Sequence, residues 1–358
     1  MTRRGALSVV AAAFALRFAL AFLLPPAFDE AYYWRLSRHL AWGYLDHPPA
    51  FAWTILAGTV PFGNGLVAVR LGAILCGALA TLATWRAGAA LAGDEARGAA
   101  AGAALNLMPA AIGLTAAATI DAPLIGASAL FLWAAIVAAR QGGAAWLAVG
   151  AAAGLALLSK YSALFEGLGL ALWLVATPAG RRHLATPWPW LGLGVAIAVF
   201  APNLAWNAGH GWATFAKQFG RVGQGGFAPL HLVDYPLGQV ALMTPPILWL
   251  AVVGARAAWR GGADDPRRLV AFVAAPLPLY MAVHALHQRV EANWLAAIYP
   301  AVAVLAAEAL AGAGDLSRAT RRWAKAAAPV GLGASALALA AAAGAFGGLA
   351  PVCAKIGG

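Results

Sequence analysis

The sequence predicts an all-α protein that crosses a membrane many times. Hydrophobic residues make up 62% of the 358 residues and charged residues only 10%, whereas a typical soluble domain has about 25% charged residues. The mean hydropathy is +0.75. Long apolar runs recur from end to end, separated by short segments that contain arginine. Because a helix needs about 20 apolar residues to cross the hydrocarbon core, we expect one polytopic helical domain over residues 1–358.

The first span is expected over residues 6–24 and follows an arginine pair that should stay in the cytoplasm. Residues 25–65 then form the first external loop, with an interfacial helix near 29–42. An apolar segment near 50–60 follows. It has roughly a dozen residues, which at about 1.5 Å per residue is too short to span a bilayer. We expect it to be re-entrant or to lie in the interface.

About eleven spans are expected in all, with the N-terminus inside and the C-terminus outside. Arginine-containing loops alternate with loops poor in arginine, as the positive-inside rule predicts. Residues 206–235 form a second long external loop, and no soluble domain is expected after the last helix. The spans after the first are expected at 66–86, 98–117, 122–139, 144–158, 162–177, 188–205, 236–257, 269–286, 294–311 and 327–347.

The net charge of +11 does not indicate a nucleic-acid partner, because the arginines lie in loops where membrane topology explains them. Cys76 and Cys353 lie far apart, and Cys76 is inside an apolar run. They predict neither a disulfide nor a metal site. No motif requires a cofactor, although a divalent ion that bridges carboxylates and a phosphate remains possible.

The polar residues that stand among apolar helices converge on the external face of this topology. Acids are rare, at 13 in the whole chain, yet three of them fall between Asp29 and Asp46. Charged groups at a membrane rim are expensive and indicate a functional site. The residues concerned are Asp29, Glu30, Asp46, His47, Asp121, Lys160, Lys217, Arg221, His287, Arg289 and Glu291.

Each candidate also has a purely structural interpretation. Asp29 could be the N-cap of the interfacial helix, and Glu30 could interact with the dipole of its first turn. Asp121 stands before Ala-Pro and could cap the next helix. Tyr32 and Tyr33 could anchor the chain at the interface. Lys160 could extend from a helix end toward the interface. Arg221 and Arg289 could be solvated loop charges, and His47 could be an ordinary loop residue.

Five motifs, in order along the chain, resemble the protein O-mannosyltransferase and aminoarabinose-transferase-like family of GT-C membrane glycosyltransferases. The first is the run Asp29-Glu30-Ala31-Tyr32-Tyr33-Trp34 with Gly43-Tyr44-Leu45-Asp46-His47-Pro48-Pro49. The others lie at residues 119–124, 158–161, 206–221 and 289–294. Two departures stand out: many family members have lysine where His47 stands, and many continue into a soluble external domain.

The resemblance implies a polyprenyl-phosphate-linked sugar donor, a lipid or glycan acceptor, and transfer with inversion. The catalytic carboxylates would be Asp29 and Glu30, with Asp29 as the general base. Lys160, His47, Arg221 and Arg289 are candidates for the donor phosphate. Residues expected to position substrates are Asp46, Asp121, Glu291, Tyr32, Tyr33 and Tyr161.

The resemblance also places the protein in a bacterial inner membrane, in contact with membrane lipids and with its active site on the periplasmic side. The alternative is a transporter or lipid flippase, another class of many-helix protein with intramembrane charge. A transporter would carry its charges near the bilayer midplane and often shows paired repeats with broken helices. The charges here gather at one rim, and no such repeat is visible in the sequence.

Overall fold

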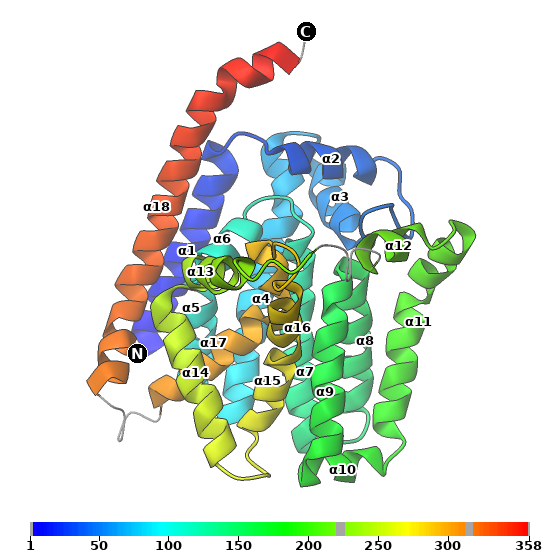
Figure 1. Cartoon of the computed structure of the whole chain (residues 1–358), viewed down its shortest axis with the longest axis vertical. Helices are drawn as coiled ribbons and strands as arrows, with labels where there is room; N and C mark the ends of the chain where they lie inside the picture. Colours follow the sequence, from blue (N-terminus) through cyan, green and yellow to red (C-terminus); the bar gives the residue numbers. More distant parts are fainter. Residues whose placement is uncertain (1–2, 220–225, 312–317, 357–358) are drawn as a thin grey trace.

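The computed structural model describes residues 3–219, 226–311 and 318–356, and these form helices and no strand (Figure 1). The first half contains α1 Arg3–Leu23, α2 Phe28–Ser37, α3 Ala50–Phe62, α4 Leu66–Ala92, α5 Glu95–Asn106, α6 Pro109–Leu114, α7 Asp121–Gln141, α8 Ala145–Ser159, η1 Tyr161–Ala163 and α9 Leu164–Ala176. The second half contains α10 Pro178–Leu184, α11 Trp188–Gly209, α12 Ala213–Phe219, α13 His231–Met243, α14 Pro245–Arg260, α15 Arg267–Ala274, α16 Pro276–His284, η2 Ala292–Ile298, α17 Tyr299–Ala311 and α18 Arg318–Ile356.

Five helices in the described ranges are long and apolar enough to cross a membrane: α1, α4, α7, α11 and the continuous η2–α17 segment. Two bent pairs, η1–α9 with α10 and α13 with α14, would raise the number to seven if each pair is one span. The chain is therefore an all-helical polytopic membrane protein. Among the described residues, five to seven helices thus qualify as spans by length and composition, fewer than the eleven that the apolar runs predicted.

Breaks within apolar runs account for part of this difference. The run expected as one span over 98–117 is divided at Met108, because Pro109 begins a new helix. The run expected over 236–257 bends by 101° between α13 and α14, where Thr244 precedes two prolines. Pro276 likewise starts α16 after α15. Hydropathy alone does not register such breaks, because the residues around them remain apolar.

A buried polar cluster lies beside the break between α5 and α6. Arg17 of α1 is 1% exposed and donates to Asn106 Oδ1 at 2.6 Å and to Thr115 Oγ1 at 2.8 Å. Asn106 in turn donates to Thr81 Oγ1 at 3.0 Å. The cluster thus fixes the chain that leads from α5 to α7.

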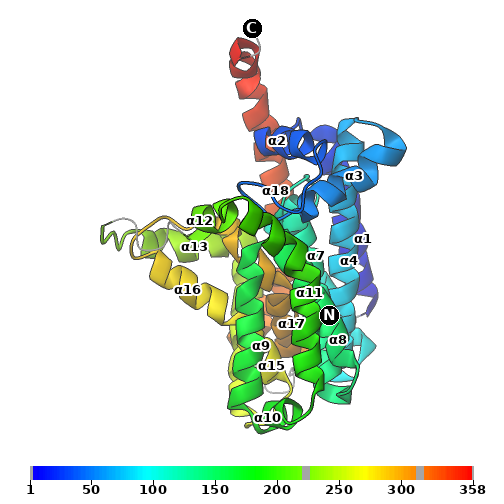
Figure 2. The ribbon, with the colours of Figure 1, turned by 90° about the vertical axis from the view of Figure 1, so that its right-hand side faces the viewer.

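The segment expected as the first external loop, 25–65, contains two helices, α2 and α3. They lie with α12 at one end of the bundle, opposite α10 (Figures 1 and 2). The segment expected as the second long loop, 206–235, contains the end of α11, α12 and the start of α13. At Gly72 an added Cβ would lie 1.8 Å from the carbonyl oxygen of Thr54. Only glycine therefore lets α3 pack this closely on α4.

Candidate active site

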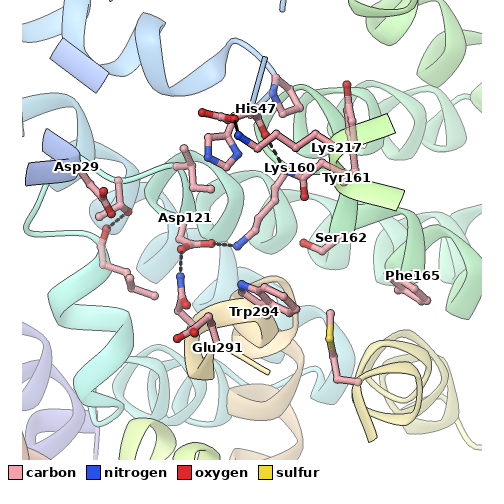
Figure 3. A pocket seen from close by; sticks show the side chains of 18 of the residues that line it. Asp29, His47, Asp121, Lys160, Tyr161, Ser162, Phe165, Lys217, Glu291 and Trp294 are labelled. Carbon is pink, nitrogen blue, oxygen red and sulfur yellow. Dashed lines mark hydrogen bonds and ion pairs between the residues drawn. The ribbon is translucent and has the colours of Figure 1, made fainter. Parts of the chain in front are cut away.

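A cavity of about 620 Å³ opens among α2, the following loop, α7, the α8–η1 junction, α12, α16 and η2 (Figure 3). Eight of the residues predicted for the site line it: Asp29, Tyr33, Asp46, His47, Asp121, Lys160, Tyr161 and Glu291. It is also lined by residues that were not assigned a role, including Thr119, Lys217, Gln218, His284, Asn293 and Trp294. The structure thus brings together residues that are up to 265 positions apart, from Asp29 to Trp294.

The centre of the cavity is an ion pair between Asp121 and Lys160. Lys160 Nζ lies 2.8 Å from Asp121 Oδ1, and Asn293 Nδ2 donates to Asp121 Oδ2 at 2.7 Å (Figure 3). The side chain of Asp121 is 2% exposed and that of Lys160 is 16% exposed. Both oxygens of Asp121 are therefore occupied, and its carboxylate fixes where the ammonium of Lys160 lies.

Local backbone structure explains how this pair is presented. Lys160 stands between α8 and η1 in an extended conformation, so its side chain leaves the helix axis at the break. Asp121 is the first residue of α7 but does not cap it, because Thr119 Oγ1 accepts from the backbone N–H of Ala122 at 3.2 Å. The purely structural interpretation of Asp121 as a helix cap is therefore wrong.

A second ion pair joins the segment between α2 and α3 to α12. Lys217 contacts Asp46, the hydroxyl of Tyr32 donates to Asp46 Oδ2 at 2.6 Å, and Gln218 donates to the Asp46 carbonyl at 2.6 Å. Burial raises the pKa of Asp46, but the hydrogen bonds from Lys217 and Tyr32 outweigh burial and hold the pKa below its usual value. Asp46 is thus an ionised anchor for the loop, and Tyr32 reaches the site only through it.

His47 follows Asp46 and faces the cavity. Its Nε2 lies 3.5 Å from the hydroxyl oxygen of Tyr33. Burial, followed by the positive charge of Lys160, lowers the pKa of His47 from 6.5 to about 4. In the free protein at neutral pH the imidazole is therefore uncharged, unlike the lysine that many relatives were expected to carry there.

Asp29 lies at the edge of the cavity, in the first turn of α2. The N-cap of α2 is Ala27, so Asp29 is not the cap. Its carboxylate is exposed, and it has no hydrogen-bond or ion-pair partner among residues 3–219, 226–311 and 318–356. Of the cavity's carboxylates it is the one that no cation in these ranges occupies, which leaves it available to a substrate.

Glu30 lies outside the cavity lining, although it was predicted to share the catalytic role. Its carboxylate is 3% exposed and pairs with Arg70 of α4 at 2.5 and 2.7 Å. It also accepts the backbone N–H groups of Ala27 at 3.0 Å and Ala118 at 2.9 Å. Burial raises the pKa of Glu30, but these hydrogen bonds hold it below the usual value. Both carboxylate oxygens of Glu30 accept hydrogen bonds within the protein, so Glu30 stabilises the fold here.

Arg70 completes this anchor by capping α1. Its guanidinium donates to the carbonyl oxygens of Leu20, Ala21, Leu24 and Pro25 at 2.8–3.3 Å, in addition to Glu30. The last carbonyls of a helix have no partner within the helix, and Arg70 supplies one. We call this set of contacts the Arg70–Glu30 staple. It joins the end of α1, the start of α2, α4 and the turn before α7.

Two predicted phosphate ligands are not placed in the cavity. Arg289 is 72% exposed, and its nearest carboxylate, that of Glu291, lies 3.8 Å away. Arg221 lies outside the described residues. Lys217 had been noted as an external cation but not assigned a role. Asn293 stood inside a motif and Arg70 inside an expected span, and neither had been assigned a role. Among the described residues no group of three or more His, Cys, Asp or Glu could hold a metal ion.

Residues 46–206 match the sequence profile of the family described as dolichyl-phosphate-mannose-protein mannosyltransferase. The match covers fewer than half of the 358 residues. This similarity favours the glycosyltransferase over the transporter interpretation. A curated relative is the lipid A galacturonosyltransferase RgtD of Rhizobium johnstonii, which is 29% identical over 283 residues, or 78% of this chain and 59% of the relative.

Two solved structures share the fold. ArnT of Cupriavidus metallidurans bound to undecaprenyl phosphate has a TM-score of 0.69 at 23% identity, over 89% of this chain and 61% of that one. The oligosaccharyltransferase AglB of Archaeoglobus fulgidus, in complex with an inhibitory peptide and a dolichol-phosphate, has a TM-score of 0.58 at 16% identity, over 94% and 56%. The chain thus spans about three-fifths of the length of RgtD and ArnT.

The Arg70–Glu30 staple yields a prediction about stability. Arg70→Met leaves the Glu30 carboxylate buried without its cation, which typically costs about 3–5 kcal/mol. Arg86→Met on the same helix removes an exposed pair with Glu95 and should cost no more than about 1 kcal/mol. The check is the unfolding midpoint of both variants in detergent. Equal midpoints would show that the staple does not support the fold.

Proposed function

We propose that the protein is a membrane glycosyltransferase that moves a sugar from a polyprenyl phosphate to a lipid acceptor on the external face of the membrane, with inversion. The observation that carries the proposal is one cavity that holds an unpaired carboxylate, Asp29, and an ammonium, Lys160, that Asp121 and Asn293 orient. The match of residues 46–206 to the mannosyltransferase family profile supports the reaction class. The undecaprenyl phosphate bound to ArnT and the lipid A named for RgtD support the donor carrier and the acceptor class.

Lys160 is suited to bind the donor phosphate. An ammonium has three N–H donors, and one of them is used by Asp121. Two remain for phosphate oxygens. Asp121 keeps the cation in place before substrate arrives, so little reorganisation is needed when negative charge develops on the leaving phosphate. His47 lies in the same cavity as a neutral imidazole and would gain a proton when the phosphate binds.

Asp29 is suited to act as general base. An acceptor hydroxyl at the cavity edge would give its proton to Asp29 while its oxygen forms a bond to the anomeric carbon. The bond from that carbon to the phosphate oxygen breaks on the opposite side, and polyprenyl phosphate leaves with both bonding electrons. Attack opposite to the leaving group inverts the anomeric carbon. Glu30 acts through the staple by holding the turn on which Asp29 lies.

The site's place in the fold supports an external active site. The helices α2, α3 and α12 lie at the end of the bundle away from α10, whose last turn is basic. Basic loops favour the cytoplasm. We therefore infer that α10 faces the cytoplasm and that the cavity opens on the periplasmic side of a bacterial inner membrane, with the N-terminus inside.

Transfer itself should be measurable with purified protein. The assay supplies undecaprenyl-phosphate donors that carry a neutral hexose, a hexuronic acid or an aminopentose, with lipid A as acceptor, and product is detected by mass spectrometry. The wild-type protein should transfer one of these sugars. Asp29→Asn should retain less than about a tenth of the wild-type turnover, because general-base catalysis contributes about 10²–10⁴-fold.

Asp234→Asn is the matched control for Asp29→Asn, since Asp234 is exposed and lies outside the cavity lining. It should leave turnover unchanged. Full turnover in Asp29→Asn would refute the assignment of the base, and absence of transfer by the wild-type protein with every donor would refute the proposed function for this donor and acceptor set.

Lys160→Met should weaken donor binding by about ten- to a hundredfold, the worth of a hydrogen bond to a charged group. Lys160→Arg should restore it only in part, because a planar fork replaces a compact ammonium. Donor affinity in detergent is the measurement, and Lys325→Met, an exposed lysine of α18, is the control. Equal affinity in all four proteins would exclude Lys160 as the phosphate ligand.

Donor binding should strengthen as the pH falls from 7 toward 5, in proportion to the protonation of His47. In the free protein the pKa of His47 is about 4, and a bound phosphate raises it, so the complex holds more protons than the free protein between these limits. A sugar phosphodiester does not itself titrate in this range. His47→Gln should bind with little pH dependence. The same slope in both proteins would assign the effect to another group.

A further inference from the structure

One part of the cavity has no task in the mechanism above. Four aromatic side chains from three elements line it: Phe165 of α9, Tyr280 and His284 of α16, and Trp294 of η2. Adjacent ring centroids lie 4.6 Å apart for Phe165 and Tyr280, 6.2 Å for Tyr280 and His284, and 5.6 Å for His284 and Trp294. We call this set the aromatic wall. In Figure 3, Phe165 and Trp294 lie on the side of the Asp121–Lys160 pair away from Asp29.

His284 is the polar member of the aromatic wall that lacks a partner. Its Nε2 atom is buried and has no hydrogen-bond partner among the described residues. A buried polar nitrogen left without a partner costs about 1–3 kcal/mol and calls for an explanation. No hydrogen bond among the described residues joins this nitrogen to Glu291, a carboxylate of the lining. A ligand in the cavity can supply the missing contact after a small rotation of the imidazole.

The composition of the aromatic wall indicates what that ligand presents. Pockets lined mostly by aromatic groups with a few polar atoms bind molecules that offer an apolar face and a few fixed polar groups. The C–H face of a sugar ring and its hydroxyls fit this description. An isoprenoid chain would cover the rings but leave His284 without a partner. A phosphate would be drawn to Lys160, which lies nearer the centre of the cavity.

We propose that the aromatic wall is a saccharide subsite, in which a sugar ring packs on Trp294 and Tyr280 and one of its hydroxyls hydrogen-bonds to His284. The inference rests on the proposed glycosyl transfer and adds a residue that positions the sugar. The ring belongs either to the donor sugar or to the glycan part of the acceptor. Both present the same chemistry, and kinetics separates them.

Two substitutions separate the contribution of the His284 nitrogen from that of its aromatic ring. His284→Phe keeps an aromatic ring of similar size but cannot hydrogen-bond. His284→Gln loses the ring and keeps donor and acceptor atoms. His39→Phe is the matched control, because His39 is exposed on the external side and lies outside the cavity lining. The measurements are the KM for donor, the KM for acceptor and kcat, together with the affinity for sugar-free undecaprenyl phosphate. The donor is the one in the panel that the wild-type protein uses, and the acceptor is lipid A.

His284→Phe should raise the KM of one of the two saccharide substrates about tenfold, the worth of one hydrogen bond to a hydroxyl. His284→Gln should recover part of this loss, and His39→Phe should match the wild type. The affinity for undecaprenyl phosphate should not change. A raised donor KM assigns the subsite to the transferred sugar, and a raised acceptor KM assigns it to the acceptor glycan.

Two results would overturn the inference while the proposed function stands. In the first, the wild-type protein transfers sugar and neither KM changes in His284→Phe. In the second, the affinity for sugar-free undecaprenyl phosphate falls as much as the KM rises, which would make the aromatic wall part of the isoprenoid path. Failure of the proposed function has a different signature, because the wild-type protein itself would show no transfer.

Discussion

The position of the site depends on one guanidinium group, that of Arg70. It bonds to four carbonyl oxygens at the end of α1 and to the carboxylate of Glu30 at the start of α2. Glu30 in turn accepts the N–H of Ala118, three residues before Asp121. The staple therefore sets the distance between α2, which carries Asp29, and the turn that leads to Asp121. Because charges buried at a membrane are costly unless fully paired, this geometry has few alternatives.

The carboxylates of the cavity fall into two sets: those that pair with a cation among the described residues and those that do not. Asp121 and Asp46 are each paired with a lysine, so under the proposed mechanism they would act on substrate only through that lysine or through the loop. Asp29 is unpaired among the described residues and lies at the cavity edge. Under the proposed mechanism this arrangement separates a base for a hydroxyl from a cation for a phosphate. The aromatic wall lies on the side of the Asp121–Lys160 pair away from Asp29, and there His284 Nε2 has no hydrogen-bond partner among the described residues.

Much of the site could be predicted because acids and lysines are conspicuous in an apolar chain. Asp29, Asp121 and Lys160 stood out by composition alone, and the cavity contains all three. The position of Glu30 could not be predicted, since its partner Arg70 lies 40 residues away inside an apolar helix. The aromatic wall is built from residues 165–294, whose spacing resembles ordinary helix packing. Among the expected helices, α1, α4 and α7 match the apolar runs closely.

The number of spans could not be read from hydropathy, because it requires the positions of helix breaks. Pro109, Thr244 and Pro276 interrupt runs that remain apolar on both sides. The neutrality of His47 was equally inaccessible, because it follows from burial and from Lys160, more than a hundred residues further along the chain. The residue types indicate the kind of chemistry, whereas contacts between residues distant in the sequence determine the partner and the charge of each group.

The most direct test of this account is a cryo-electron microscopy structure of the protein with undecaprenyl phosphate bound. The account predicts phosphate density within hydrogen-bond distance of Lys160 Nζ, with Asp121 and Asn293 still in contact and Asp29 facing the open side of the cavity. Phosphate bound outside this cavity, or inside it and away from Lys160, would contradict the account.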